Sequence, residues 1–248
     1  MERLFSNSPI GYNYQCTLFP IGWHAGAQVS RNQSKKQSPS DQFDRFLGSL
    51  IHGDASGCAL VTEHKLDNQV SILDLYQGLF QPALYRIGDL WAANRLSVAT
   101  EHMATAITEG LMNRLYPRLV NRNRCGLKVV MAPVEGELHQ VGAKMAADVF
   151  EMHGWDCLFL GGGQTTERLL SELKDVKPDM LGLSFSVFYH MDILQRMLTR
   201  IRAEYSDLPI LVGGQGLSLG GTELEEAFKV TCVRNLDELD ALLAHIHN

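Results

Sequence analysis

The sequence has few cysteines, and they form no pattern. Five occur in 248 residues, an odd number, and no two of them make a C-x-x-C pair. This scatter argues against a disulfide framework and against a cysteine-based zinc site, and it is typical of reduced thiols in a cytosol. The cysteines are Cys16, Cys58, Cys125, Cys157 and Cys232. We therefore expect a cytoplasmic protein.

A long apolar run and an excess of basic residues are also missing. No apolar run reaches the length of a membrane span, and the N-terminus lacks a basic region followed by a hydrophobic core. Lysine and arginine number 22 against 28 aspartates and glutamates, which gives a net charge of −6. Non-specific DNA binding depends on basic side chains that neutralise phosphates. The sequence therefore predicts a soluble protein that neither enters a membrane nor binds nucleic acid directly.

Hydrophobic patterning divides the chain into three segments. Residues 1–41 have no clear period and end in a Ser/Gln/Lys-rich stretch, so we interpret them as an N-terminal segment that is partly a disordered linker. Between residues 42 and 120 apolar positions recur every three and four residues, which predicts a bundle of four to five helices. From residue 126 to residue 248, short apolar runs alternate with helical patterns, which indicates a second domain.

Five short apolar runs in the last segment are typical of buried parallel strands. They are Leu127–Val134, Cys157–Leu160, Met180–Ser186, Ile210–Val212 and Thr231–Val233. Helical stretches follow them, beginning near Gln140, Thr165, Met191, Leu219 and Leu236. This alternation predicts an α/β domain with a five-stranded, doubly wound parallel sheet of the Rossmann-like, flavodoxin-like kind. Ligands of such sheets bind beyond the carboxyl ends of the strands.

Three short motifs lie where predicted strands end. An acid-x-His-x-x-Gly element, Glu137–Gly142, follows the first strand and contains His139. Ser184 and Ser186 close the third strand, and the pair Gly213-Gly214 follows the fourth. Because the carboxyl ends of parallel strands meet at one edge of a sheet, we expect these motifs to lie together.

The chemistry of these motifs suits a large cofactor that carries a metal. A neutral imidazole such as that of His139 is a good ligand for a transition metal, and the nearby carboxylate of Glu137 can fix its tautomer and raise its basicity. Ser184 can hydrogen-bond this pair or a cofactor tail, and the bare backbone of Gly213 and Gly214 lets a tail lie against it.

The spacing of the three motifs resembles that of the cobalamin-binding domain that takes its cofactor base-off, His-on. The resemblance implies cobalamin as the cofactor, in its adenosyl, methyl or hydroxo form, with His139 as the lower ligand of cobalt. It implies that Gly142 and Ser186 also line the cofactor. The family more usually has aspartate where this chain has Glu137, and this departure bears on the geometry of the carboxylate–histidine pair.

Taken singly, each motif has an ordinary interpretation. A histidine in a loop after a strand is most often a helix cap or a surface residue, and a Gly-Gly pair is most often a tight turn. Gly161–Gly163 and Gly213–Gly216 could also be phosphate-binding loops, although neither has the dinucleotide or P-loop spacing.

The helical segment carries a second group of residues. Nine residues separate Trp91 from the pair Glu101-His102. Ten or eleven steps along an α-helix are close to three turns, so the three side chains would share one face of a continuous helix. A break at Asn94–Leu96 would remove that argument. A tryptophan on such a face is more often part of a core, and a Glu-His pair is more often solvated.

A Trp-x9-Glu-His element ahead of a cobalamin domain resembles the light-sensing cobalamin proteins, the CarH transcription factors and the AerR antirepressors. The resemblance implies that Trp91 caps the upper axial group and that Glu101 contacts the upper ligand or a dimer interface. It implies that His102 becomes a second metal ligand, in the upper position, once light has broken the cobalt–carbon bond.

CarH-type proteins carry an N-terminal DNA-binding domain, and the ~40 residues ahead of the bundle are too few for one. The resemblance therefore implies a light sensor without enzymatic activity that regulates transcription through a protein partner, such as a repressor. A light-dependent homo-oligomer is a second form of output that it allows.

Other functions stay open. A corrinoid carrier of a methyltransferase system has the same domain order and the same lower histidine, but it needs its upper cobalt face free and has no use for Trp91 or His102. A cobalamin-dependent mutase subunit would need a substrate barrel, which this sequence does not encode. A nucleotide- or flavin-binding regulator could use the same doubly wound sheet.

Overall fold

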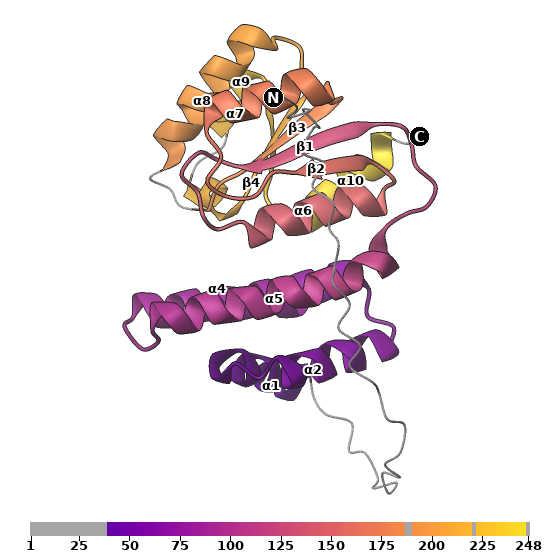
Figure 1. Ribbon diagram of the computed structural model, residues 1–248, viewed down its shortest axis with the longest axis vertical. Coiled ribbons are helices and arrows are strands. Elements are labelled where there is room, and N and C mark those ends of the chain that lie inside the picture. Colours follow the sequence, from indigo (N-terminus) through magenta and orange to yellow (C-terminus); the bar gives the residue numbers. More distant parts are fainter. Residues whose placement is uncertain (1–38, 187–189, 220–221, 247–248) are drawn as a thin grey trace, which may run out of the picture. The chain divides into compact units, whose positions relative to one another are not determined.

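The computed structural model describes residues 39–186, 190–219 and 222–246 (Figure 1). The aromatic stretch and most of the linker predicted for residues 1–41 lie outside the described residues. The first helix begins at Pro39, slightly before the start of the bundle predicted at residue 42. No helix within the described ranges is both long enough and apolar enough to cross a membrane.

The N-terminal half of the described chain is a helical bundle. Its helices are α1 (Pro39–His52), α2 (Ala55–Asp67), α3 (Ile72–Leu75), α4 (Gln81–Ala92) and α5 (Val98–Leu119), with a π-helical turn, Tyr76–Phe80, between α3 and α4. Side chains of Asp54, Ser71 and Ser97 cap α2, α3 and α5 by accepting hydrogen bonds from backbone amides. Pro82 lies in the first turn of α4, which continues directly from the π-helical turn.

The C-terminal half is a five-stranded parallel sheet with the order β2-β1-β3-β4-β5. The strands are β1 (Lys128–Pro133), β2 (Asp156–Phe159), β3 (Met180–Ser184), β4 (Ile210–Gly213) and β5 (Thr231–Val233). The predicted fold class, a helical bundle followed by a doubly wound sheet, is confirmed. The strand order reverses between β1 and β3, and ligands of such sheets bind beside this switch point. The register pairs Ser184 with Gly213, so two of the predicted motifs are neighbours at the carboxyl edge.

Helices cover both faces of the sheet in Figure 1. On one face lie α6 (Val141–Met152) and α10 (Leu236–Ile246), and on the other lie α7 (Thr166–Val176), α8 (Met191–Glu204) and α9 (Thr222–Phe228). A short 3-10 helix, Gln215–Leu219, follows β4. The α7–α9 face has its own apolar core, whereas the core on the α6–α10 face continues into the bundle.

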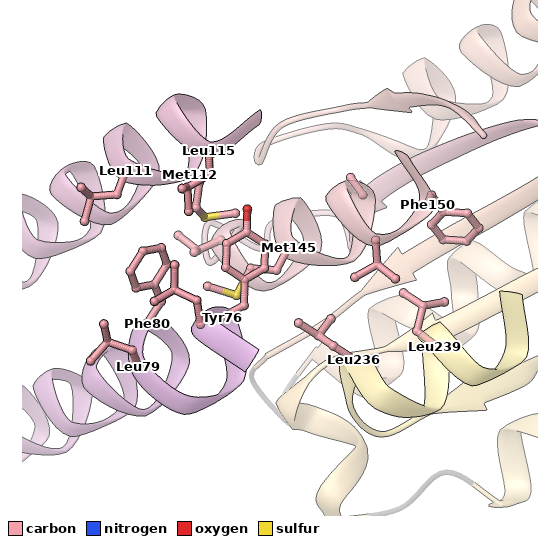
Figure 2. Packing of buried hydrophobic residues seen from close by; sticks show 14 of the residues in the cluster. Tyr76, Leu79, Phe80, Leu111, Met112, Leu115, Met145, Phe150, Leu236 and Leu239 are labelled. Atoms are coloured by element: carbon pink, nitrogen blue, oxygen red, sulfur yellow. The ribbon is translucent and has the colours of Figure 1, made fainter. Parts of the chain in front are cut away.

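Side chains of the bundle pack directly against α6 and α10 (Figure 2). Met112 of α5 and Tyr76 of the π-helical turn lie beside Met145 of α6, and Leu111 and Leu115 of α5 belong to the same apolar cluster. Inside this contact, the Tyr76 hydroxyl donates a hydrogen bond of 2.7 Å to the buried carboxylate of Asp148. Gln77 donates a second bond, of 2.6 Å, to Asp237 of α10. The bundle is therefore fixed on the helices that flank the carboxyl edge of the sheet.

Candidate functional site

A large cavity lies between the bundle and the carboxyl edge of the sheet. Helices α4 and α5 form one wall, and the ends of β3 and β4 with the first turns of α6 and α10 form the other. Its volume is about 1070 Å³, at the upper end of the roughly 300–1,000 Å³ of most ligand pockets. The site therefore has room for a large cofactor.

Much of the cavity wall is apolar and uncovered. Trp91 and Leu138 are 47% and 77% exposed, and Tyr85 and Val98 are also exposed although they line the same cavity. Large apolar side chains that gather around a concavity mark a surface that a ligand covers. These four residues come from both walls, so the covering ligand must touch the bundle and the sheet domain together.

The loop after β1 places His139 on the lower wall. The Val134 amide donates to the Ser184 carbonyl, Gly136 turns the chain with a φ of +80°, and α6 begins at Val141. This path buries the Glu137 side chain to 1% exposure and leaves the His139 side chain 60% exposed at the cavity. The loop thus buries one member of the predicted pair and leaves the other accessible from the cavity.

Hydrogen bonds hold the imidazole of His139 in one orientation. Its Nδ1 lies 2.5 Å from Glu137 Oε1, and its backbone amide donates to the same oxygen at 2.9 Å. Burial acts to raise the pKa of Glu137, but hydrogen bonds from His139 and from the Ser186 amide outweigh it and lower the pKa to about 2. An ionised carboxylate only accepts hydrogen bonds, so Nδ1 of His139 must donate. The lone pair of Nε2 is then free to bind a metal.

Charge on Glu137 also makes His139 more basic. The hydrogen bond to Glu137 is the main cause that raises the pKa of His139; burial opposes it, and the charges of Glu137 and Glu101 add to the rise. A more basic imidazole is a stronger metal ligand once it is deprotonated. Glu101 lies on α5, so this smallest contribution comes from the other wall of the cavity.

A second histidine, which the sequence analysis missed, contacts the same carboxylate. His190 Nδ1 lies 3.2 Å from Glu137 Oε2, which also accepts a hydrogen bond of 2.9 Å from the Ser186 amide. Ser186 thus contributes through its backbone, whereas its side chain lines the cavity. His190 precedes α8 and belongs to no recognisable motif, so only a search for polar residues beyond every strand end could have found it.

Ser184 lies at the end of β3 with its side chain at the cavity wall. The residue is buried, and within the described part of the chain its hydroxyl has no hydrogen-bond partner. Of the two partners considered for Ser184, the Glu137–His139 pair is not bonded to its hydroxyl within the described residues, and the hydroxyl is left for a ligand.

The three predicted glycines differ in why they are glycine. Gly214 has a φ of +110°, and a Cβ there would clash with the Phe185 carbonyl, so its own turn requires glycine. A Cβ at Gly213 would lie 3.3 Å from the Val233 carbonyl oxygen, which is a tight contact. A Cβ at Gly142 would meet nothing within 4 Å, although Gly142 lines the cavity. Of the three, only Gly142 has no internal contact or turn that requires glycine, and its missing side chain suits close approach of a ligand.

Trp91, Glu101 and His102 meet on the upper wall, but not on one helix. The break that the sequence left open at Asn94–Leu96 is present, because α4 ends at Ala92 and Asn94 adopts a left-handed φ of +54°. Ser97 then caps α5, so the chain turns and Trp91 in the last turn of α4 comes close to the start of α5. The three residues line one cavity wall because the chain turns between α4 and α5.

The side chains of the upper wall are open to the cavity. His102 is 75% exposed, and its Nε2 lies 3.4 Å from Glu101 Oε2. Glu101 Oε1 accepts a hydrogen bond of 3.1 Å from Thr105, one turn further along α5. Glu101 is thus fixed, while the His102 ring has only this one polar contact within the part of the chain that the structure describes.

One contact joins the two walls at the cavity itself. The Gln140 side chain donates to Glu109 of α5 at 2.9 Å and accepts from the Gly162 amide at 2.9 Å. Gln140 follows His139 directly, so the loop of the lower histidine is tied to the helix that carries Glu101 and His102.

Comparisons with known proteins identify the class of ligand. Two family models, each described as a B12 binding domain, match this chain, one over residues 127–241 and the other over residues 42–116. Residues 127–241 form a B12 binding domain. The protein is thus a cobalamin-binding protein, and the predicted cofactor is confirmed.

Relatives of the cobalamin-binding protein include corrinoid proteins and a transcriptional repressor. Monomethylamine corrinoid protein 1 of Methanosarcina mazei is 25% identical over 169 residues, which cover 65% of this chain and 77% of the relative. The HTH-type transcriptional repressor CarA of Myxococcus xanthus is 24% identical over 223 residues, which cover 84% of this chain and 73% of the relative.

A solved structure shares the fold. The monomethylamine corrinoid protein of Methanosarcina barkeri superposes with a TM-score of 0.69 at 18% identity, over 84% of this chain and all of that one. Both halves of the described chain therefore have the arrangement found in a corrinoid-binding protein.

The residues present fit a cobalamin. His139 offers a neutral nitrogen with a fixed tautomer, Ser184 offers a free hydroxyl at the strand edge, and Gly142 leaves room for close approach. The uncovered apolar side chains, Trp91 and Leu138 among them, match the apolar surface of a corrin ring. His139, Ser184 and Gly142 would hold the cofactor from below, and α4 and α5 would cover it.

Proposed function

We propose that the cobalamin-binding protein is a light sensor that regulates transcription through a partner protein and catalyses no reaction. The observation that carries the proposal is the upper wall of the cavity, where Trp91, Glu101 and His102 line the same cavity as His139. When bound, an alkylcobalamin supplies the photochemistry, since light breaks the bond between cobalt and its upper carbon ligand. The protein's part is to respond to the loss of that ligand.

Trp91 and His102 give the bundle two ways to respond. The exposed ring of Trp91 needs an apolar group to cover it, so removal of the upper ligand exposes apolar surface that α4 and α5 can rebury only by moving. The open His102 imidazole is a second metal-ligand candidate and would hold the bundle in its new position. A partner that binds one position of the bundle better than the other would respond to this movement.

The relative CarA supports a regulatory role, because it is named as a transcriptional repressor and aligns over both halves of this chain. A repressor or another transcription factor is therefore the kind of partner that we propose. The contact between Gln140 and Glu109 provides a route by which a change at either face of the cofactor reaches the other wall.

A corrinoid carrier of a methyltransferase system is the second candidate, and the relatives favour it. Three of the matched relatives are monomethylamine corrinoid proteins, and so is the solved structure with a TM-score of 0.69. The fold and the lower histidine serve a carrier equally well. The upper wall separates the candidates, because a carrier needs open access above the cofactor, whereas Trp91 and His102 line that side here.

Illumination of two proteins side by side tests the proposal. Wild type and His102→Ala are loaded with adenosylcobalamin in the dark and exposed to green light, and absorption spectra and hydrodynamic size are recorded before and after. The sensor predicts a different final spectrum for the two proteins, since only wild type can offer a second imidazole, and a change of size or shape in wild type. Identical final spectra with no change in size would favour the carrier.

A further inference from the structure

Glu137 is a crowded carboxylate. Oε1 accepts hydrogen bonds from the backbone amide and from Nδ1 of His139, and Oε2 accepts from the Ser186 amide and lies 3.2 Å from Nδ1 of His190. Two imidazoles from different segments therefore share one buried carboxylate. Only one of them, His139, is presented to the cavity.

The position of His190 is not explained by its own helix. His190 is the N-cap residue of α8, but its side chain makes no capping hydrogen bond. The ring is instead directed at a carboxylate 53 residues earlier in the chain, and its side chain is only 21% exposed. An ordinary surface histidine would point into water, so the contact between His190 and Glu137 requires an explanation.

Removing His190 would leave Oε2 of Glu137 with the Ser186 amide alone. A carboxylate held at one oxygen by an amide and a ring can neither tilt nor rotate without breaking one of these bonds. Its other oxygen then lies where His139 Nδ1 can donate to it, and this fixes the direction of His139 Nε2. The hydroxyl of Ser184 does not contribute, because within the described residues it contacts neither Glu137 nor His139.

We propose that His190 is a positioning residue for the lower cobalt ligand, acting through Glu137 on His139. The inference deepens the proposed cofactor site and rests on His139 as the ligand. Partners that hold the groups around a metal ligand typically matter by 10–100-fold in affinity. We expect about a 10-fold weaker binding of cobalamin when the His190 donor is lost.

The test uses three variants of the full chain. His190→Leu removes the donor and keeps much of the volume, and His190→Asn restores an N–H donor close to the position of Nδ1. His153→Leu is the matched control, since His153 also pairs with a carboxylate, Asp240 at 2.8 Å, and is 17% exposed. Circular dichroism of each apo-protein checks folding, and His190→Ala replaces the Leu variant if that one does not fold.

Two readouts are recorded for each protein: the Kd for cobalamin, and the electron paramagnetic resonance spectrum of the Co(II) form bound to protein labelled with ¹⁵N. The label distinguishes a protein imidazole from the cofactor's own benzimidazole, because ¹⁵N and ¹⁴N split the signal differently. We expect the ¹⁵N splitting to be weakened or lost in His190→Leu and restored in His190→Asn, with His153→Leu like wild type.

Full ¹⁵N splitting and unchanged affinity in His190→Leu would overturn the inference and leave His139 as the ligand. The inference would also be overturned if His190→Asn did not restore the ¹⁵N splitting that His190→Leu loses, because the N–H donor would then not be the cause of that loss. Wild type without any ¹⁵N splitting would instead remove His139 as the ligand, and the role of His190 with it.

Discussion

Replacing Tyr76 by phenylalanine removes one hydroxyl from the junction between the bundle and the sheet domain. That hydroxyl donates a 2.7 Å hydrogen bond to Asp148, and both residues are buried. Burial raises the pKa of Asp148, although the charge of Lys144 and the Tyr76 hydroxyl partly oppose the rise. A hydrogen bond to a charged group contributes about 1.5–3 kcal/mol, and Lys144, at 3.8 Å, stays beside the carboxylate. We expect Tyr76→Phe to lower the free energy of unfolding by about 2 kcal/mol.

Urea denaturation of the apo-protein, followed by circular dichroism, measures this change. Tyr205→Phe is the control, because within the described residues the Tyr205 hydroxyl has no hydrogen bond; its effect should stay within about 0.5 kcal/mol. In an Asp148→Ala background, Tyr76→Phe should cost little, since the acceptor is gone. A cost for Tyr76→Phe no larger than that of the control, or one that persists in this background, would refute the reasoning.

Two further predictions concern the lower wall. In Gly142→Ala the new methyl group meets nothing within 4 Å, and glycine disfavours a helix, so the free energy of unfolding of the apo-protein should rise by up to about 1 kcal/mol in urea denaturation. Titration should nevertheless show weaker cobalamin binding. Unchanged affinity would mean that the cofactor does not approach this backbone. Glu137 has a pKa of about 2 in the folded chain against an ordinary 4.5, so the unfolded chain takes up the proton first as the pH falls. The contribution of Glu137 to stability is therefore complete above pH 4.5 and lost towards pH 2. In that window the free energy of unfolding of wild type should fall by up to about 1.4 kcal/mol per pH unit more than that of Glu137→Gln. Parallel pH profiles of the two proteins would contradict the depressed pKa.

The sheet domain could be predicted from the sequence because local signals are strong there. The buried run that became β3 and the helix start at Met191 follow from apolar patterning alone. Ser184 and Gly213 came to one edge because parallel strands must end together. His139 was expected at the same edge for the same reason, and it lines the cavity there because the loop after β1 opens at that edge.

The rest depends on contacts that are distant in the sequence. Tyr76 and Asp148 are 72 residues apart, and neither position stands out in its own segment. His190 is the N-cap residue of α8, and no period or motif in the sequence singles it out. The hairpin that brings Trp91 to the start of α5 depends on the left-handed backbone of Asn94, and helical periodicity does not reveal such a turn.

Hydrogen exchange with and without cobalamin tests the central claim most directly, namely that the cofactor lies between the bundle and the sheet. The account predicts that cobalamin slows amide exchange in two separate regions: in α4 and α5, around Trp91 and Glu101, and in the loop and first turn of α6 around His139 and Gly142. Protection confined to residues after Gly126, with α4 and α5 unchanged, would contradict it, because the bundle would then not cover the cofactor.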